Sequence, residues 1–221
     1  MEKEAIIKRL KAKPDLQLFV TEGLDDENML PILLDIVKTD NTSVKYTCTK
    51  VVRLINEQRP ELVYPYFEQV ASWLKHPNSF IKWDACRILA DLAAVDLENK
   101  FARIYQDYFD LIHDPQMITA ANVIGNAWKI VQARLEWESD ITGRLLEVPG
   151  IVYLHEGEPS PECNSIACGH VIKCFDHYFN RSANQAEMLL FAEEQRKSTR
   201  KAVSKIAEKF LQRHRNQNCK I

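Results

Sequence analysis

The chain has little of what defines a membrane or secreted protein. Only six of its 221 residues are glycine, and no apolar run approaches the roughly 18–20 residues that a membrane-spanning helix needs. The first five residues, MEKEA, are too acidic for a secretory signal. We therefore expect a cytoplasmic protein that makes no membrane contact.

The motifs of the common enzyme classes are missing as well. The sequence contains no glycine-rich phosphate loop, no HExxH helix and no nucleophile elbow. No pair of carboxylates has a spacing that implies acid–base catalysis. We predict that the protein is not an enzyme and has no catalytic residues.

The cysteines are scattered, which favours free thiols in a reducing compartment over a disulfide framework. Five cysteines and histidines nevertheless fall within 15 residues, and three of them share one helical face. Zinc would require four such ligands in a tetrahedron, but paired CxxC knuckles are absent, and a cysteine in a helical apolar stripe is more often a small buried residue. We predict no metal and no cofactor. The six cysteines are Cys48, Cys86, Cys163, Cys168, Cys174 and Cys219. The five residues that fall within 15 positions are Cys163, Cys168, His170, Cys174 and His177.

An internal repeat is the most informative feature that is present. Residues 39–45 (TDNTSVK) and 76–82 (HPNSFIK) are similar turns, and residues 113–119 (HDPQMIT) are a weaker third copy. The apolar residue that closes each turn falls at Val44, Ile81 and Ile118, a spacing of 37 residues each time. A period of this length is typical of a solenoid, in which each unit buries its apolar face against its neighbours.

Turn residues and helical periodicity divide the chain into helix pairs. A helix at 4–11 and another with Pro14 in its first turn come first. The expected pairs are 27–39 with 43–56, 61–75 with 79–95, and 100–113 with 116–136. The second helix of a fourth pair includes Ile166 to Phe175. One apolar stripe occurs in two copies 37 residues apart: Val44, Cys48, Val51, Val52 and Ile55, then Ile81, Ala85, Ile88, Leu89 and Leu92.

Residues 61–94 resemble a HEAT repeat, with Pro65 in the first helix, His76-Pro77-Asn78 in the turn, and Ile81-Lys82 opening the second helix before Ala85, Leu89, Leu92 and Ala93. Val44-Lys45 matches the same pattern one copy earlier, whereas the third copy keeps Asp114-Pro115 but has Thr119 in place of the basic residue. The resemblance implies an all-α, α-α superhelix of about four stacked pairs whose second helices line a concave face. It also implies a protein-binding scaffold more than an enzyme.

We expect a solenoid over residues 1–182, with cap helices at 1–25 and a loop insertion at 147–162, followed by a helical cap at 183–221. The insertion, rich in proline and glycine, is either a functional loop or a cover for the side of the solenoid. The segment from Arg196 onward contains nine basic residues and one acidic residue, Glu208. This segment is either an arm for nucleic acid or the solvated face of a capping helix. We expect fraying from His214 onward.

Helical geometry points Trp83, Arg87 and Ala90 away from the apolar stripe. The residues at the equivalent positions one repeat earlier are Tyr46, Lys50 and Arg53. Aromatic rings with cations four residues later are typical of binding surfaces. We predict that Tyr46, Lys50, Arg53, Trp83 and Arg87 bind another protein or peptide. The alternative, that the rings pack on neighbouring repeats and the cations are merely solvated, stays open. The third pair has Ala120 and Ile124 at these positions, so the surface is expected to be short.

A second function is compatible with the same fold. A class of alkylpurine DNA glycosylases is built from HEAT-like repeats and uses tryptophans, an aspartate and an arginine in a concave cleft. Such an enzyme needs a strongly basic cleft, whereas the chain outside its basic tail carries a net charge of −10, and no ordered motif matches. Binding to nucleic acid is therefore the second choice. The residues of the right types are Trp83, Asp84, Arg87, Trp128 and Trp137.

Overall fold

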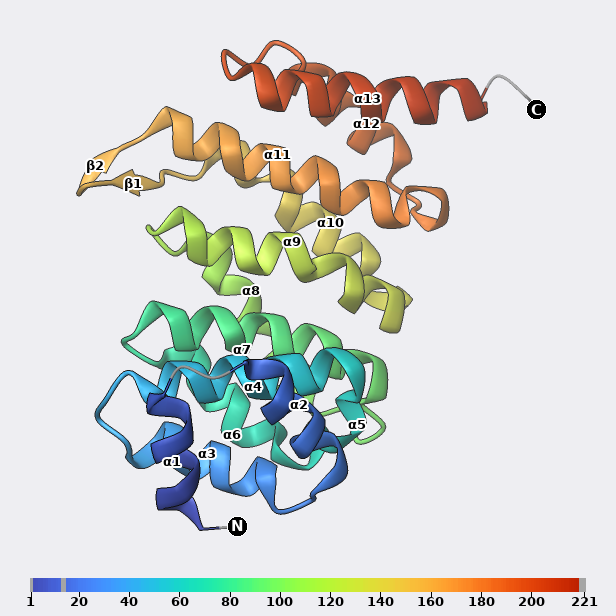
Figure 1. The fold of residues 1–221 in the computed structure, drawn as a ribbon. Helices are drawn as coiled ribbons and strands as arrows, with labels where there is room; N and C mark the ends of the chain where they lie inside the picture. The colour runs from blue at the N-terminus through green and yellow to red at the C-terminus, as the bar shows by residue number, and fades with distance from the viewer. Residues whose placement is uncertain (1, 13–14, 219–221) are drawn as a thin grey trace. The chain divides into compact units, whose positions relative to one another are not determined.

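The computed structural model describes residues 2–12 and 15–218, with side chains as far as His214, and nearly all of this is helical (Figure 1). The prediction of an all-α fold is confirmed. The strands among the described residues are two residues long, β1 Leu154–His155 and β2 Glu158–Pro159, and they pair as an antiparallel hairpin. The predicted helix start at Pro14 lies outside the described residues, as do Cys219 and Lys220.

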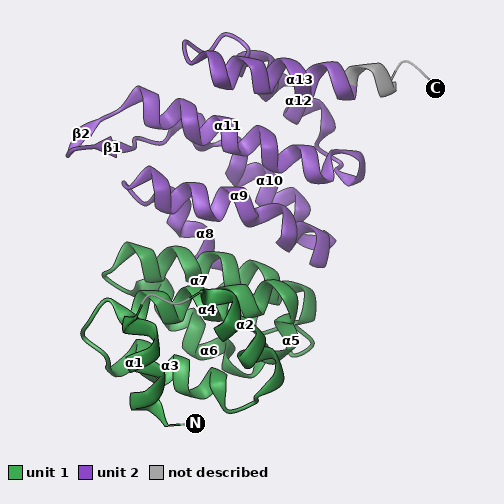
Figure 2. Cartoon of the chain, viewed as in Figure 1, with its two compact units in different colours: residues 1–104 green, residues 105–221 purple. Residues whose placement is uncertain are grey.

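The chain divides into two compact units, residues 1–104 and 105–221 (Figure 2). Helix α8, Phe101–Phe109, contains the boundary. The last two helices pack on the helix before them within the second unit. The expected division of the chain at residue 182 stays a prediction.

In the first unit, each expected helix ends within about two residues of its predicted position when the 3-10 turns Trp73–Lys75 and Ala93–Val95 are counted with the helices they follow. Pro65 has no backbone N–H to donate, so the first helix of the second pair changes to a short 3-10 turn at that point. Asn78 caps the helix that follows, because its side chain accepts a hydrogen bond from the backbone N–H of Phe80 at 3.0 Å. The helices are α1 Lys3–Lys11, α2 Leu16–Asp25, α3 Met29–Thr39, α4 Val44–Gln58, α5 Pro60–Val63, α6 Phe67–Ser72 and α7 Ser79–Leu92.

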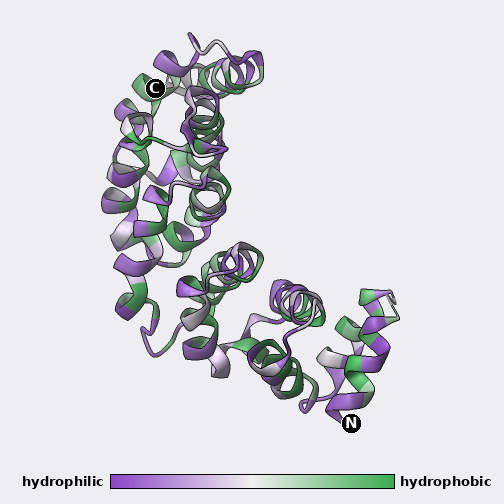
Figure 3. Ribbon diagram, turned by 90° about the vertical axis from the view of Figure 1, so that its left-hand side faces the viewer, coloured by the Kyte–Doolittle hydropathy of each residue, from purple (hydrophilic) through white to green (hydrophobic). Residues whose placement is uncertain are grey.

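The core of this unit confirms the two apolar stripes read from the sequence. Every residue of the stripes that begin at Val44 and Ile81 is buried. Helix α4 packs against both α3 and α7, and green and purple alternate along these helices, as expected for amphipathic segments (Figure 3).

The second unit contains helix α11 between α9 and α13, with which it makes its main contacts. Helix α10 and the long insertion connect α9 to α11. The predicted loop at 147–162 is shorter than expected because Pro161 occupies the first turn of α11, where its missing N–H costs nothing. The further helices of this unit are α9 Met117–Ala133, α10 Glu138–Leu146, α11 Pro161–Tyr178, α12 Gln185–Gln195 and α13 Lys201–Asn218.

The third copy of the repeat differs from its predicted register. Ile118 is 50% exposed, whereas Ala120 and Ile124, expected on the outer face, are fully buried. The buried residues Ala120, Ile124, Ala127 and Val131 follow Ile81, Ala85, Ile88 and Leu92 by 39 residues and not by 37. The third copy is therefore shifted by two residues along its helix.

The insertion after α10 is anchored to the body of the unit. Tyr153 is buried and donates a hydrogen bond from its hydroxyl to the carbonyl of Ile112 at 2.9 Å. The backbone N–H of Leu154 donates to the carbonyl of Pro115 at 2.9 Å. Asn164 in α11 donates to the carbonyls of Val148 and Ile151. These bonds hold both ends of the insertion against neighbouring elements.

Candidate functional site

Two of the predicted binding residues, Tyr46 and Trp83, each lie close to a third ring. Phe80, at the start of α7, is 60% exposed. Its ring centroid lies 6.1 Å from that of Tyr46 and 5.1 Å from that of Trp83, the latter in an edge-on arrangement. We call Tyr46, Phe80 and Trp83 the aromatic cluster. The sequence reasoning missed Phe80, although its position one residue before the stripe at Ile81 turns it away from the core.

Hydrogen bonds behind the cluster hold it in place. The side-chain amide of Asn78 donates to the hydroxyl of Tyr46 at 3.0 Å, while its carbonyl oxygen caps α7. The backbone N–H of Asn78 donates to the imidazole of His76 at 2.9 Å. Because one asparagine ties α4 to the first turn of α7, the cluster is organised before any ligand arrives, which lowers the entropy cost of binding.

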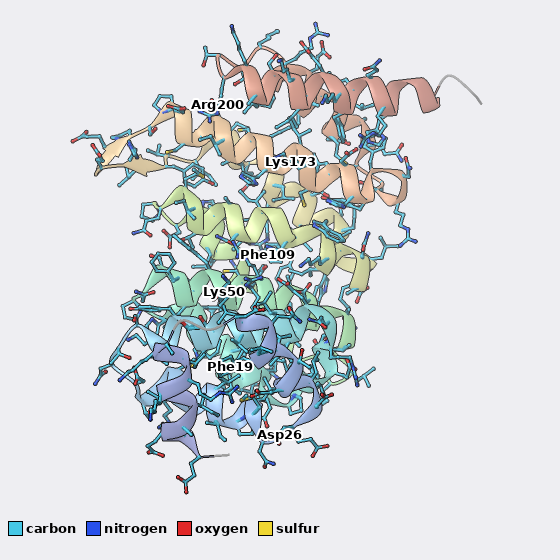
Figure 4. The ribbon with its side chains drawn as sticks, in the orientation of Figure 1. Phe19, Asp26, Lys50, Phe109, Lys173 and Arg200 are labelled. Carbon is cyan, nitrogen blue, oxygen red and sulfur yellow. The ribbon has the colours of Figure 1, made fainter. Side chains whose placement is uncertain are left out.

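The predicted cations take different roles in the structure. Lys50 is exposed on α4 (Figure 4), and the ammonium of Lys45 lies 5.5 Å from the ring centre of Tyr46. Arg53 donates from Nε to Oδ1 of Asp84 at 3.0 Å and also pairs with Glu57. Arg53 and Asp84 are only 14% and 13% exposed, so this guanidinium joins α4 to α7.

Two other residues of the predicted face lie deeper than expected. Arg87 is half-buried. Ala90 was expected to point away from the core but is buried, because a methyl side chain is too short to extend past its neighbours. The accessible part of the predicted surface is therefore the end near the aromatic cluster and Lys50.

Side-chain hydrogen bonds within each unit join residues about one repeat apart. In the first unit, Thr49 donates to Asp84 at 2.8 Å across 35 residues. In the second, Tyr105 donates to Asp140 across 35 residues, and Thr142 bonds the hydroxyl of Tyr178 across 36. Elements one helix pair apart in the sequence are thus direct neighbours in space.

The cysteines and histidines of α11 do not converge on one point. Cys168 and Cys174 are buried. His177 is exposed and stacks on Trp128 of α9, with ring centroids 4.1 Å apart. His170 lies against Gly125, where an added Cβ would be 3.9 Å from its Nδ1. Among the residues that the structure describes, no three histidines, cysteines or carboxylates are grouped as a metal ion would require.

The described thiols are free, and several are unreactive by position. Burial raises the pKa of Cys168 to about 11 and that of Cys174 to about 12. Burial, with the nearby carboxylate of Asp40, raises the pKa of Cys48 to about 12 as well. Because the thiolate is the nucleophile and the metal ligand, these three cysteines fit the role of small core residues.

One buried carboxylate was not singled out from the sequence. Glu138 lies at the start of α10 and accepts hydrogen bonds from Thr142 at 2.8 Å and Ser182 at 2.6 Å. Asn184 donates to both of its oxygens. The carboxylate ties α10 to the segment before α12, and a buried carboxylate whose two oxygens both accept hydrogen bonds from neighbouring side chains fits a structural role.

Two grooves of the structure lie away from the five predicted binding residues. A groove of about 670 Å³ in the first unit is lined by α3 and α6 with their adjoining turns, including Lys38, Trp73 and His76. A second, of about 390 Å³, lies between the insertion and the start of α11. None of the five predicted binding residues lines either groove. The candidate surface consists of the exposed side chains of Phe80 and Lys50 with the partly exposed Tyr46 and Trp83, and we call it the ridge.

Compared with the known protein families, with curated proteins and with solved structures, the chain shows no match. Within the described part of the chain, none of the helices combines the length and the hydropathy needed to cross a bilayer.

Proposed function

We propose that the chain is a non-enzymatic, HEAT-like helix-pair protein that binds another protein or a peptide in the cytoplasm. The motifs at Val44-Lys45 and Ile81-Lys82 support HEAT-like repeats, as do the helix pairs and the hydrogen bonds between residues one repeat apart. The free, buried thiols are compatible with a reducing compartment.

The observation that carries the proposal is the exposure of Phe80 within a held cluster. Large aromatic side chains are the commonest anchors at protein interfaces, because they bury much area for little loss of conformational freedom. Phe80 presents such a ring to solvent, and the rings of Tyr46 and Trp83 both lie close to it. The nearby ammonium groups of Lys45 and Lys50 favour a ligand that combines an apolar anchor with a carboxylate.

The residues that a glycosylase-like active site would use are engaged in other contacts. Asp84 is the carboxylate that a glycosylase-like site would use, but one oxygen accepts from Arg53 and the other from Thr49. Trp128 stacks on His177, and the Trp137 ring lies against Tyr105. These groups are engaged in contacts inside their own units.

Selection from a random peptide library tests the proposal. Peptides enriched on the 221-residue chain should bind the Phe80→Ala variant at least about tenfold more weakly, the loss expected when an interface anchor is truncated. Lys50→Glu should weaken only those peptides that carry a carboxylate. The matched control is Leu97→Ala, because Leu97 is an apolar residue of the same unit that is 96% exposed. If the peptides bind the wild type and Phe80→Ala equally, the ridge is not the binding surface.

A further inference from the structure

A separate surface, on helix α13 of the second unit, carries charge almost entirely of one sign. The inner face of α13 packs on α11 and α12, and it consists of the buried residues Val203, Ala207, Phe210, Leu211 and His214. On the outer side, Lys201, Lys205 and Lys209 follow one another at every fourth position and are all exposed. We call these three residues the lysine row.

Arginines, not lysines, dock this helix on the body of the unit. Arg200 pairs with Glu162 at the start of α11, and Arg213 pairs with Asp176 near its end (Figure 4 labels Arg200). His214 bonds the other oxygen of Asp176 at 2.7 Å and lies between Phe179 and Phe210. The expected fraying at His214 is therefore wrong, because its ring is part of the core.

The lysine row takes no part in this docking. Within the described part of the chain, the side chains of Lys201, Lys205 and Lys209 make no ion pair or hydrogen bond. Like charges four residues apart destabilise a helix. Cations in the first turns also oppose the helix dipole, and Lys201 is the first residue of α13. The row thus lowers the stability of its own helix and, among the described residues, contributes no ion pair or side-chain hydrogen bond that would offset this.

The spacing of the row suits a polyanion with closely spaced charges. A rise of 1.5 Å per residue places Lys209 about 12 Å along the axis from Lys201. Double-stranded nucleic acid carries one charge per roughly 1.7 Å of axis, so about seven phosphate charges lie along that length. We propose that the lysine row binds the phosphate backbone of a nucleic acid duplex without reading its sequence. Lysine is suited to this task because it acts as a point charge and makes no bidentate base contact in this arrangement.

An anionic membrane fits this surface less well than a duplex. A helix that lies in a membrane interface needs its apolar face free to enter the lipid, and the apolar face of α13 is buried against α11 and α12. The large apolar residues of the helix lie on that inner side. The outer side between the lysines holds Ala202, Glu208 and Gln212, all exposed, and Glu208 is the one carboxylate there.

Fluorescence anisotropy with a labelled duplex of mixed sequence, about 20 base pairs long, tests the proposal on the 221-residue chain. Three phosphate contacts predict an affinity that falls about 40-fold between 50 and 200 mM salt. The triple variant Lys201→Gln, Lys205→Gln, Lys209→Gln should lose most of the binding at 50 mM salt and nearly all of the salt dependence. The matched control is Lys8→Gln, Lys11→Gln, Lys38→Gln, which removes three exposed lysines of the first unit and should bind as the wild type does.

Circular dichroism separates loss of binding from loss of folding, because removing the like charges should leave the helix content unchanged or slightly raise stability. Each single lysine variant should reduce the salt slope by about 1. Three outcomes would overturn the proposal: no binding of the duplex at 50 mM salt, equal binding by the triple variant and the wild type, or binding to phosphatidylserine vesicles without binding to the duplex. The peptide selection uses other residues in the other unit, so failure of either proposal is distinguishable from failure of the other.

Discussion

The two units solve the same packing problem with different side chains. In the first unit, α4 and α7 are joined by polar groups, with Arg53 and Thr49 both bonded to Asp84. In the second, α11 approaches its neighbours closely at glycines, with His170 against Gly125 of α9 and Val203 of α13 against Gly169, and Arg213 of α13 also pairs with Asp176 of α11. Helices one pair apart thus lie next to each other in both units, but the side chains that join them differ.

This difference has a consequence for what each unit can present. A polar interface needs its partners in register, and the bonds of Asn78 and Asp84 hold α4 and α7 in the one arrangement that exposes the aromatic cluster. In the second unit, the close contact at Gly169 and the ion pair of Arg213 with Asp176 hold α13 on α11, and the lysines of α13 lie on its exposed side. We infer that the surface chemistry of each unit follows from how its second helices meet.

The largest expected effect comes from breaking the polar interface. Asp84→Ala leaves Arg53 and Thr49 without their shared partner in a site that is only about one seventh exposed. We expect the free energy of unfolding to fall by about 2–3 kcal/mol, below the usual value for a broken buried pair because Arg53 keeps Glu57. Urea unfolding gives the size of the loss, and hydrogen exchange should show faster opening in α4 and α7.

The control for this change is Glu68→Ala in the same unit. It removes the ion pair of Glu68 with Arg103, whose side chains are 63% and 68% exposed, and exposed pairs contribute less than about 0.5–1 kcal/mol. Similar losses for Asp84→Ala and Glu68→Ala would show that the interface of α4 with α7 does not depend on the buried pair.

How far the sequence predicts this structure depends on whether a helix keeps the spacing of the repeat. In α4 and α7, one apolar stripe is bounded by turns rich in Asn, Asp, Ser and Pro, so the helices and their buried faces could be read directly. In α9, the buried stripe lies two residues further along, and a fixed offset chose Ile118, which is exposed, over Ala120, which is buried. A fixed period cannot reveal such a shift.

The candidate site was predictable only in part for a related reason. The positions of Tyr46, Lys50 and Trp83 follow from the angle around a single helix. The pairing of Arg53 with Asp84 depends instead on the register between two helices, which one sequence does not reveal. Phe80 was overlooked because a hydrophobic residue next to Ile81 is indistinguishable by composition from a second core residue.

A smaller effect is expected from filling the close contact in the second unit. A Cβ added at Gly169 would lie 3.2 Å from Cγ2 of Val203, so Gly169→Val should push α13 away from α11 and lower the stability by about 2 kcal/mol. Hydrogen exchange should locate the loss in α13.

Gly143→Ala is the matched control for this substitution. Gly143 lies inside α10 with no atom within 4 Å of an added Cβ, so the change should stabilise the protein by up to about 1 kcal/mol through helix propensity. If the Gly169→Val variant is as stable as the wild type, the close contact at Gly169 is not what distinguishes the packing of the second unit.

The smallest effect concerns the imidazole at the interface of α9 with α11. Burial, aided by the charge of Lys173 (labelled in Figure 4), lowers the pKa of His170 below its ordinary value of about 6.5. The folded state then binds fewer protons than the unfolded state, so His170 contributes stability above that ordinary pKa, and this contribution is lost as the pH falls below it.

Titration of the imidazole by NMR should therefore give His170 a pKa below about 6.5. In Lys173→Gln the pKa should move upward, because one of its two causes is gone. His170→Gln should remove part of the loss in melting temperature between pH 7 and pH 5.5. The stability of the first unit, which has an arginine–aspartate pair at the corresponding interface, should not change with this substitution. An unperturbed or raised pKa would mean that the imidazole stays solvated beside Gly125, and that the glycine contact between α9 and α11 is looser than the one between α11 and α13.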